Sequence, residues 1–545
     1  MKEHVKKFDY EEIRSSFSFE CPDDFNFAFD VLAKKALEVD KVALISIDRN
    51  GNHVKDVSYA ELDRVSSRFA NALLRLGVAK TDNVLVVLPR IPEWYHVLFG
   101  CAKMGAVAMP GTNLLTANDI EYRINSAGAK VVVVSEVHAG FVEAIKKNCP
   151  TLEHLILVRG IRAGWHSFDA ICSQSSGHID RSMVPPTSSK DLILIYFTSG
   201  STAMPKMVGR DHAYSLSHSI TKSYWQDLRE DDVHWTLTDT GWAKAAWGLL
   251  YPQLLASCTI VLYDGEGFDL ETHLRIIKQY RVTTFCAPPT IYRLMAQADL
   301  SGADFSSLRH CFGAGEPLNP EAMRAWKKAT TCDIYDGYGQ TETINIVANF
   351  PGMEIRPGSM GKPCPGLIVD IIDDEGNILA NGEIGHIGIK ITDPYPPGLF
   401  TGYYLDDAKT AEVFRNGWYY SGDTATRDSD GYIWFVGRSD DVISSSGYRI
   451  SPFEVESALI EHLAVAESAV VAKPDPVRGG IVKAYIVLAS GYEASNELVD
   501  DIQNFVKQHS APYKYPREIE FVGALPKTIS GKIRRVELRE SAAKV

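Results

Sequence analysis

The sequence predicts an α/β protein with a large N-terminal domain of helix-covered sheets and a small β unit, followed by a small, mobile α+β C-terminal domain. Three observations lead to this fold class. Short apolar runs alternate with amphipathic stretches over most of the 545 residues, short strands with turn signals follow residue 360, and a compact α+β pattern follows Gly437. We therefore place the large domain at 1–437, a polar, glycine-bounded hinge at 438–447 and the mobile domain at 448–545.

Runs of β-branched residues bounded by turn signals predict the buried strands of the large domain. They are 83–89, 130–135, 155–158, 192–197, 259–263 and 282–287. The clearest helix is 60–76, where apolar residues recur at steps of three and four. Ser58 and Glu61 form a capping-box signature before it, and Gly77 is a suitable stop after it.

The later part of the chain predicts shorter elements. Residues 370–379 suggest two strands around a turn, and 386–391 suggest a further strand. The C-terminal domain is expected to contain a helix from Pro452, a helix at 496–509, and strands at 469–472, 482–488 and 518–522.

Composition excludes several classes of function. The 56 basic and 69 acidic residues give a net charge of −13, which argues against a nucleic-acid-binding surface. The nine cysteines include no CxxC pair, so reduced thiols are expected rather than a disulfide framework or a metal site. No signal-peptide pattern and no membrane span are found in the sequence, and we expect a cytoplasmic monomer or homodimer acting on small molecules.

Two loops carry the chemistry of phosphate binding. The run YFTSGSTAMPK at 196–206 joins a strand to hydroxyls, a glycine and Lys206, which suit a polyphosphate. Pro205 stands where a P-loop needs glycine, and a solvated Ser/Thr loop fits the run equally well. The run GAGEP at 313–317 precedes DGYGQTE at 336–342, which offers Tyr338 for stacking on adenine and Glu342 for Mg²⁺. A Gly-rich turn with a surface acid is the alternative.

Two further motifs lie toward the C-terminus. WYYSGD at 418–423 supplies Asp423, a carboxylate suited to ribose hydroxyls, and the following GRSDDVISSSGYRI supplies Arg438 and Arg449 as phosphate partners. Two β-turns, in which the Asp and Ser side chains form hydrogen bonds within the protein, would account for the same residues. PKTISGKIRR at 526–535 presents Lys532 from a flexible turn, where an exposed basic tail is the alternative.

The order and spacing of these four motifs resemble the adenylate-forming superfamily of acyl-CoA synthetases, luciferases and peptide-synthetase adenylation domains. The runs GYGQTET, GSMGKP, SSGYRISPFEVESALIEH, PDPVRG and APYKYPR resemble the medium-chain acyl-CoA synthetases in particular. The resemblance implies that a carboxylic acid reacts with ATP to give acyl-AMP and pyrophosphate, and that CoA then displaces AMP. ATP, Mg²⁺ and CoA are the implied cofactors and co-substrates.

The resemblance also implies roles for individual residues. Lys532, Thr341 and Glu342 would be catalytic, with Glu342 binding Mg²⁺, and Asp440 would be the hinge acid. The residues implied for ATP are Thr198, Ser199, Gly200, Ser201, Thr202, Lys206, Gly315, Glu316, Pro317, Asp336, Gly337, Tyr338, Gly339, Gln340, Thr341, Asp423, Arg438 and Lys532. Those implied for the acyl group are Trp242, Gly339, Thr341 and Arg449, and those for CoA are Ser446, Gly447, Tyr448, Arg478, Lys507, Tyr515, Pro516 and Arg517.

The acyl group is expected to be medium-chain, branched or cyclic. Acetate-specific members of the superfamily carry tryptophan where this chain has Gly339, so Gly339 predicts room for a longer acyl group. Lys244 is expected to face the CoA channel or solvent rather than to pair with a second carboxylate of the substrate. Ala203 replaces the glycine usual in the phosphate loop.

Other activities share parts of this pattern. An aromatic-acid CoA ligase is the main alternative, and an adenylate-forming enzyme with another acceptor is a further one. An amino-acid activator would need an acid near Trp242, which the run 241–248 lacks. A luciferase-like oxygenase shares the ATP motifs, whereas a catalytically dead nucleotide sensor should have lost Lys532.

Overall fold

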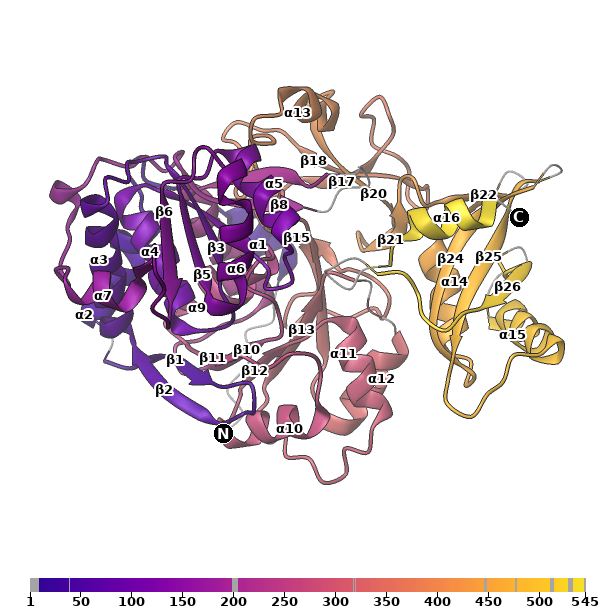
Figure 1. Ribbon diagram of the computed structural model, residues 1–545. Helices are drawn as coiled ribbons and strands as arrows, with labels where there is room; N and C mark the ends of the chain where they lie inside the picture. Colours follow the sequence, from indigo (N-terminus) through magenta and orange to yellow (C-terminus); the bar gives the residue numbers. More distant parts are fainter. Residues whose placement is uncertain are drawn as a thin grey trace, which may run out of the picture.

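The computed structural model describes residues 9–38, 40–198, 204–316, 318, 320–445, 448–475, 478–509, 514–527 and 533–543, with only the backbone of Tyr448 and Arg449. Figure 1 shows a large body of sheets covered by helices and, beside it, a smaller unit that the chain reaches last. The α/β fold class predicted from the sequence is confirmed. Within the described residues, no helix is both long and apolar enough to cross a membrane.

A seven-stranded sheet forms the first half of the large body. All neighbouring strands are parallel except the last pair, β8–β9, which is antiparallel. In spatial order the strands are β7 (His166–Ser167), β6 (His154–Val158), β5 (Val131–Ser135), β3 (Asn83–Val87), β4 (Val107–Gly111), β8 (Leu192–Thr198) and β9 (Lys206–Asp211).

Side-chain alternation along these strands buries both faces of the sheet. Val84 and Val86 belong to the core that includes α3 (Tyr59–Arg75) and α4 (Pro92–Met104). Leu85 and Val87 point the other way, toward α5 (Ala117–Ala127) and α6 (Glu136–Ile145). Helix α3 confirms the clearest prediction: the Ser58 hydroxyl accepts from the Glu61 N–H at 3.1 Å, and Gly77 has φ +78° after its end.

A nine-stranded sheet forms the second half. Its middle strands, from β14 to β1, are parallel, whereas β2, β15 and β16 pair antiparallel at its edges. In spatial order they are β16 (Lys362–Pro363), β15 (Asn345–Ala348), β14 (Ile334–Gly339), β13 (His310–Ala314), β12 (Thr284–Cys286), β10 (Val233–Thr236), β11 (Thr259–Tyr263), β1 (Val42–Ile47) and β2 (His53–Ser58).

Helices pack on this second sheet as well. Trp235, Phe285 and Cys311 share one core with α10 (Leu270–Gln279), α11 (Pro289–Gln297) and α12 (Pro320–Thr330). The opposite face, with Cys286 and Phe312, joins the core of the first sheet. The remaining helices of the body are α1 (Tyr10–Ser16), α2 (Lys34–Glu38), α7 (Phe168–Ser173), α8 (His212–Ile220), α9 (Tyr251–Ala256) and α13 (Asp407–Val413).

An antiparallel five-stranded sheet follows, at the top of the body in Figure 1. Its strands are β17 (Val369–Ile372), β18 (Gly385–Lys390), β20 (Trp418–Arg427), β19 (Phe414–Arg415) and β21 (Ile433–Arg438). This sheet differs from the sequence prediction in one respect. The second strand expected within 370–379 is only an isolated bridge between Ile372 and Ile378, since the turn leaves no room for a longer ladder.

The C-terminal unit has its own apolar cores and lies to the right of the body in Figure 1. Its elements are β22 (Ile443–Ser445), β23 (Tyr448–Ile450), α14 (Pro452–Ile460), β24 (Val465–Asp475), β25 (Gly479–Leu488), α15 (Asn496–His509), β26 (Glu518–Phe521) and α16 (Arg535–Ala543). The domain boundaries at 437 and 447 stay a prediction.

Candidate active site

The β8–β9 hairpin presents the predicted phosphate residues at one end. Thr198 and Lys206 face each other in its last register pair, on either side of the loop. Ser199, Gly200, Ser201, Thr202 and Ala203 lie outside the described residues. Burial lowers the pKa of Lys206, as does the nearby Lys409 ammonium, while Glu342 opposes the shift. Cationic groups thus gather beside the loop, as a polyphosphate site requires.

Glu342 lies next to this hairpin and is held from two sides. The Tyr403 hydroxyl donates to Glu342 Oε1 at 3.0 Å, and the Lys206 ammonium sits 5.0 Å from the centre of the Tyr403 ring. The Glu342 carbonyl accepts from Arg210 Nη1 at 2.7 Å and from the Phe400 N–H at 2.8 Å.

Sequence reasoning missed Arg210 and Tyr403. Arg210 is 1% exposed, and its guanidinium lies 3.7 Å from the centre of the Tyr214 ring. Strand β9 offers no clear signal for Arg210, because charged residues also stand at its two ends and only the fold shows which of them is buried. For Tyr403 we find no signal in the sequence, since its contacts form only when distant segments meet.

Strands β13 and β14 place the next predicted residues side by side, with Gly313 opposite Asp336. Gly315 follows with φ +102°, and Glu316 Oε2 accepts from the Thr290 hydroxyl at 2.9 Å, while Pro317 lies outside the described residues. Asp336 is only 6% exposed, and its Oδ1 accepts from the Gly337 N–H at 2.9 Å. The side chain of Asp336 is therefore buried in the protein, and this burial raises its pKa well above the usual range.

Asp423 is the centre of a polar cluster between the five-stranded sheet, to which it belongs, and the nine-stranded sheet. Its Oδ2 accepts from the Tyr338 hydroxyl at 2.6 Å and from Gln340 Nε2 at 2.8 Å. The Tyr419 hydroxyl donates to Gln340 Oε1 at 2.9 Å and so fixes that amide. Arg438 lies opposite Asp423 in the β20–β21 register, with 3.4 Å between its Nε and Asp423 Oδ1. The structure thus brings together four residues predicted for the nucleotide, Tyr338 and Gln340 from one motif and Asp423 and Arg438 from the next.

The predicted acyl residues lie on the turn after β10 and at the end of β14. Asp239 fastens the turn that carries Trp242, because its carboxylate accepts from the Gly241 N–H at 2.7 Å and the Thr112 hydroxyl at 3.0 Å. Gly339 approaches backbone closely: a Cβ there would lie 2.4 Å from the Ile344 carbonyl oxygen. Glycine is therefore required at 339 by the β14–β15 pairing, whatever the acyl chain length.

Lys244 does not face solvent, which was one of the two surroundings expected for it, and its place beside a CoA channel stays a prediction. Its Nζ is buried and has no hydrogen-bond partner within the described residues, and it lies 5.4 Å from the centre of the Trp247 ring. Lys244 and Trp247 stand three positions apart in a helical stretch, a spacing that places their side chains next to each other.

Some predicted residues of the C-terminal unit gather around one ring. Lys507 Nζ lies 4.3 Å and the Arg517 guanidinium 5.0 Å from the centre of the Tyr515 ring, and Arg517 Nη1 donates to the Tyr515 hydroxyl at 3.1 Å. Pro516 lies within this turn, and Arg478 is on the β24–β25 connection. Ser446, Gly447 and Lys532 lie outside the described residues, as do the side chains of Tyr448 and Arg449.

Comparison with known proteins decides the family. Residues 33–404 match the family described as AMP-binding enzyme, and residues 454–532 match the AMP-binding enzyme C-terminal domain. The chain belongs to this AMP-binding enzyme family. The prediction of an adenylate-forming protein is confirmed.

Relatives within the AMP-binding enzyme family cover nearly the whole chain. Acyl-coenzyme A synthetase ACSM3, mitochondrial, of Rattus norvegicus is 45% identical over 541 residues, which are 97% of this chain and 93% of that protein. Acyl-coenzyme A synthetase ACSM4, mitochondrial, of Homo sapiens is 44% identical over 95% of this chain and 91% of its own. The resemblance to the medium-chain acyl-CoA synthetases is thereby confirmed.

Solved structures of the family show the same fold. The anthranilate CoA ligase AuaEII in complex with anthranoyl-AMP superposes with a TM-score of 0.88 at 32% identity, covering 96% of this chain and 98% of that one. The benzoate CoA ligase from Burkholderia xenovorans LB400 gives a TM-score of 0.82 at 28% identity, covering 94% and 100%.

The carboxylate of Glu342 fits a magnesium ion that arrives with a nucleotide. The described residues include no cluster of three or more metal-binding side chains. Mg²⁺, however, is commonly held by one or two carboxylates together with substrate phosphates and water. Glu342 Oε1 takes one hydrogen bond from Tyr403, which orients the carboxylate beside the phosphate hairpin.

Proposed function

We propose that this AMP-binding enzyme is an AMP-forming ligase that joins a medium-chain, branched or cyclic carboxylic acid to CoA. The acid's carboxylate attacks the α-phosphorus of ATP and releases pyrophosphate, which gives acyl-AMP. The CoA thiolate then attacks the acyl carbon and AMP leaves, so that a thioester forms. Splitting one difficult condensation into two displacements is the logic of covalent catalysis.

The likeness to acyl-coenzyme A synthetases carries this proposal, since it extends at 45% identity over 97% of the chain. The residues act mainly by positioning and by charge stabilisation. Lys206 and the hydroxyls of its loop hold the outer phosphates, Asp423 holds the ribose, and Tyr338 stacks on adenine. Lys532 stabilises the charge that builds on the reacting carboxylate and α-phosphate.

Three finer points belong to the same proposal. Glu342 holds Mg²⁺, which neutralises phosphate charge when it is bound. Lys507, Tyr515 and Arg517 meet the phosphates of CoA, because two cations on one ring form a compact positive surface. The enzyme is cytoplasmic and a monomer or homodimer, although the relatives named above are called mitochondrial.

An aromatic acid is the second candidate substrate. The structural neighbours named as anthranilate and benzoate CoA ligases favour it, with TM-scores of 0.88 and 0.82. Their sequence identities of 32% and 28% are lower than the 45% to the ACSM3 relative, so we place medium-chain acids first.

Pyrophosphate release with and without CoA, over linear, branched, cyclic and aromatic acids of two to twelve carbons, tests the proposal. We expect ATP–pyrophosphate exchange with medium-chain acids and thioester only when CoA is added. Lys532→Ala should abolish acyl-AMP formation and spare thioester formation from supplied acyl-AMP. Lys527→Ala, whose ammonium pairs with Glu467 at 2.7 Å, is the matched control and should leave both steps intact. Absence of exchange with every acid would refute the proposal.

A further inference from the structure

The side-chain amide of Gln340 directs its hydrogen-bonding groups at the protein. Its Nε2 donates to the Asp423 carboxylate and to the Ser421 carbonyl, both at 2.8 Å, and its Oε1 accepts from the Tyr419 hydroxyl at 2.9 Å. An amide nitrogen carries two hydrogens, so both are in use. Gln340 therefore has no side-chain donor left for a nucleotide, and its side chain acts through Asp423.

The orientation of this amide depends on the Tyr419 hydroxyl. Burial raises the pKa of Tyr419 well above its usual range, so the hydroxyl keeps the proton that it donates to Gln340 Oε1. The reversed amide would direct its oxygen at the Asp423 carboxylate and the Ser421 carbonyl, which are both acceptors, and would take the acceptor away from the hydroxyl proton. Only the observed orientation satisfies all three partners of Gln340.

Strand β20 supplies these partners from one face. Tyr419, Ser421 and Asp423 are spaced two residues apart, and side chains at this spacing point the same way along a strand. Tyr419 is 1% exposed, and the centres of the Phe400 and Phe414 rings lie 5.4 and 5.3 Å from the centre of its own. The ring is thus held by apolar contacts, and its hydroxyl can be removed without removing them.

Asp423 has one oxygen that is held and one that is presented. Its Oδ2 accepts from the Tyr338 hydroxyl at 2.6 Å and from Gln340 Nε2 at 2.8 Å, which are two donors for the two lone pairs of that oxygen. Its Oδ1 lies 3.4 Å from Arg438 Nε. The carboxylate can turn only by breaking the bonds to Oδ2, so Oδ1 keeps one direction, and it is the oxygen that remains for a ribose hydroxyl.

We propose that Tyr419 is a positioning residue for nucleotide recognition, which through Gln340 holds the Asp423 carboxylate in the orientation that receives a ribose hydroxyl. The inference rests on the proposed function and gives Tyr419 and the Gln340 side chain a role apart from contact with ATP. Tyr338 contributes from the other side, because the ring proposed to stack on adenine also donates to Asp423. The platform for the base and the acceptor for the sugar are thus joined by one hydrogen bond.

Tyr419→Phe tests the proposal, because it removes the hydroxyl and keeps the ring. The affinities for ATP, 2′-deoxy-ATP and 3′-deoxy-ATP are measured by calorimetry with Mg²⁺ and without acid or CoA. The wild-type protein should bind ATP about 10- to 100-fold more tightly than the analogue that lacks the hydroxyl received by Asp423, the range of a hydrogen bond to a charged group. In Tyr419→Phe this ratio should fall about 3- to 10-fold, with the affinity for that analogue unchanged. A merely structural effect would weaken all three nucleotides alike.

Tyr420→Phe is the matched control. Tyr420 follows Tyr419 in the same strand and is also buried, but its side chain joins a core with Ile372 and Trp418 on the other face. Its hydroxyl donates to the Asp373 carbonyl at 3.2 Å. This variant loses a buried hydroxyl of the same kind and should keep the wild-type ratio.

Gln340→Met tests whether Tyr419 acts through the amide. If it does, Tyr419→Phe added to Gln340→Met should cause no further fall in the ratio. Additive falls, or equal weakening of all three nucleotides in Tyr419→Phe, would overturn the positioning role and leave the proposed ligase in place. If Tyr419→Phe does not fold, Gln340→Met alone gives the ratio, and an unchanged ratio there overturns the proposal equally.

The wild-type measurement separates this inference from the proposed function. If the wild-type protein binds all three nucleotides equally, Asp423 receives no ribose hydroxyl and the inference alone fails. If it binds none of them, the proposed function fails and the inference fails with it.

Discussion

Arg210 shows how a buried side chain can hold the backbone of a residue proposed as catalytic, Glu342. Its guanidinium donates to the backbone carbonyls of Glu342 and Gly398, and Tyr214 covers it from one side. Because the guanidinium does not touch the Glu342 carboxylate, Arg210 is a positioning residue. It ties strand β9, which starts at Lys206, to the segment that supplies the predicted magnesium ligand.

Arg210→Met should remove the bond to the Gly398 carbonyl and leave the Glu342 carbonyl with only its bond from the Phe400 N–H, and should lower the free energy of unfolding by about 2 to 4 kcal/mol. It should also raise the Mg²⁺ concentration needed for half-maximal ATP–pyrophosphate exchange several-fold, because Glu342 loses its fixed backbone. A magnesium titration of the folded variant measures this effect, with the exposed Arg49→Met as control. A loss of stability with an unchanged magnesium titration would show that Arg210 is structural only.

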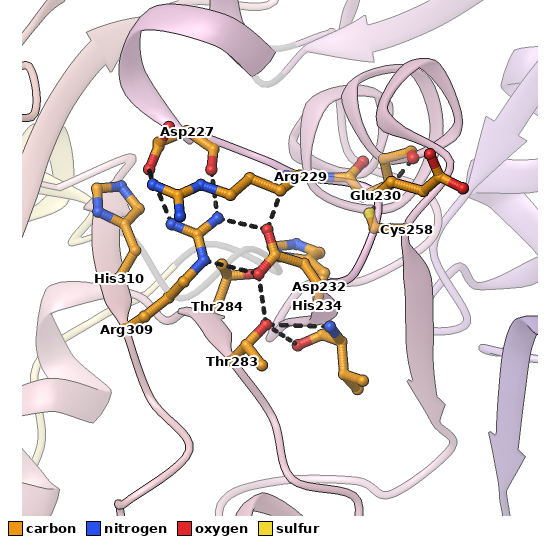
Figure 2. A network of polar contacts seen from close by, with 12 residues as sticks. Asp227, Arg229, Glu230, Asp232, His234, Cys258, Thr283, Thr284, Arg309 and His310 are labelled. Carbon is orange, nitrogen blue, oxygen red and sulfur yellow. Dashed lines mark hydrogen bonds and ion pairs between the residues drawn. The ribbon is translucent and has the colours of Figure 1, made fainter. Parts of the chain in front are cut away.

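At the scale of elements, one network of ion pairs and hydrogen bonds connects three parallel strands at their amino ends. The candidate active site lies at the opposite, carboxyl ends. Asp232, Thr283 and Arg309 directly precede β10, β12 and β13, and Figure 2 shows them converging with Asp227. Asp232 Oδ1 accepts from Arg309 Nε at 2.8 Å and from the Thr283 hydroxyl at 2.7 Å, and Arg309 Nη1 donates to Asp227 Oδ2 at 2.8 Å. Strand order is thus fixed at the amino ends, while the carboxyl ends remain for ligands.

Arg309→Met should destabilise the protein by about 3 to 5 kcal/mol, because it leaves Asp232, which is 2% exposed, as a buried and unpaired charge. Arg229→Met is the matched control: Arg229 is 61% exposed and pairs with Asp227 at 3.0 Å, so its loss should cost less than about 1 kcal/mol. Denaturant unfolding measures both. An equal effect of the two variants would contradict a buried network.

The same network predicts a pH dependence. Burial alone would raise the pKa of Asp232, but hydrogen bonds from Arg309 and Thr283 outweigh it, so that the folded pKa lies below the usual value. The stability from this carboxylate is therefore complete above the unfolded pKa, which is about 3.9, and is lost as the pH falls through the folded value. The difference in unfolding free energy between wild type and Arg309→Met should shrink below about pH 4.

The sequence predicts helices and strands well where the apolar residues follow a single helical or strand spacing. Helix 60–76 differs from α3 by one residue at each end, and the runs at 155–158 and 259–263 match β6 and β11 to within a residue. The prediction of a second strand within 370–379 was wrong, because a turn signal shows where a strand ends but not how many residues pair with the next strand. Of the site, motif residues could be predicted, whereas Arg210 and Tyr403 could not. Their roles depend on contacts with Glu342 across 132 and 61 positions of sequence.

At the scale of the whole molecule, the last helix fastens the predicted hinge. Arg539 of α16 donates to the Asp440 carbonyl at 2.8 Å, pairs with the Asp441 carboxylate, and lies 3.6 Å from the Asp440 carboxylate. Next to it, Arg535 donates to both oxygens of Glu456, at 2.8 and 2.7 Å. A rotation of the C-terminal unit that leaves Asp440 with the large body must break the contacts between Arg539 and Asp440, and these contacts then oppose the rotation away from the present orientation.

Arg539→Met should weaken this orientation. The half-reaction that the orientation serves should slow several-fold relative to the other, since a partly exposed charged contact contributes about 1 kcal/mol or somewhat more. Separate rates of acyl-AMP formation and of thioester formation from supplied acyl-AMP give the ratio, and small-angle X-ray scattering of the ligand-free protein should show a broader distribution of shapes. Arg534→Met is the control, because Arg534 directly precedes α16, is 54% exposed and forms an ion pair with Glu537 in the first turn of that helix. If both variants give the wild-type ratio and the wild-type scattering curve, the contacts of Arg539 do not govern the motion, and the orientation must be held by the packing of α14 on β21 instead.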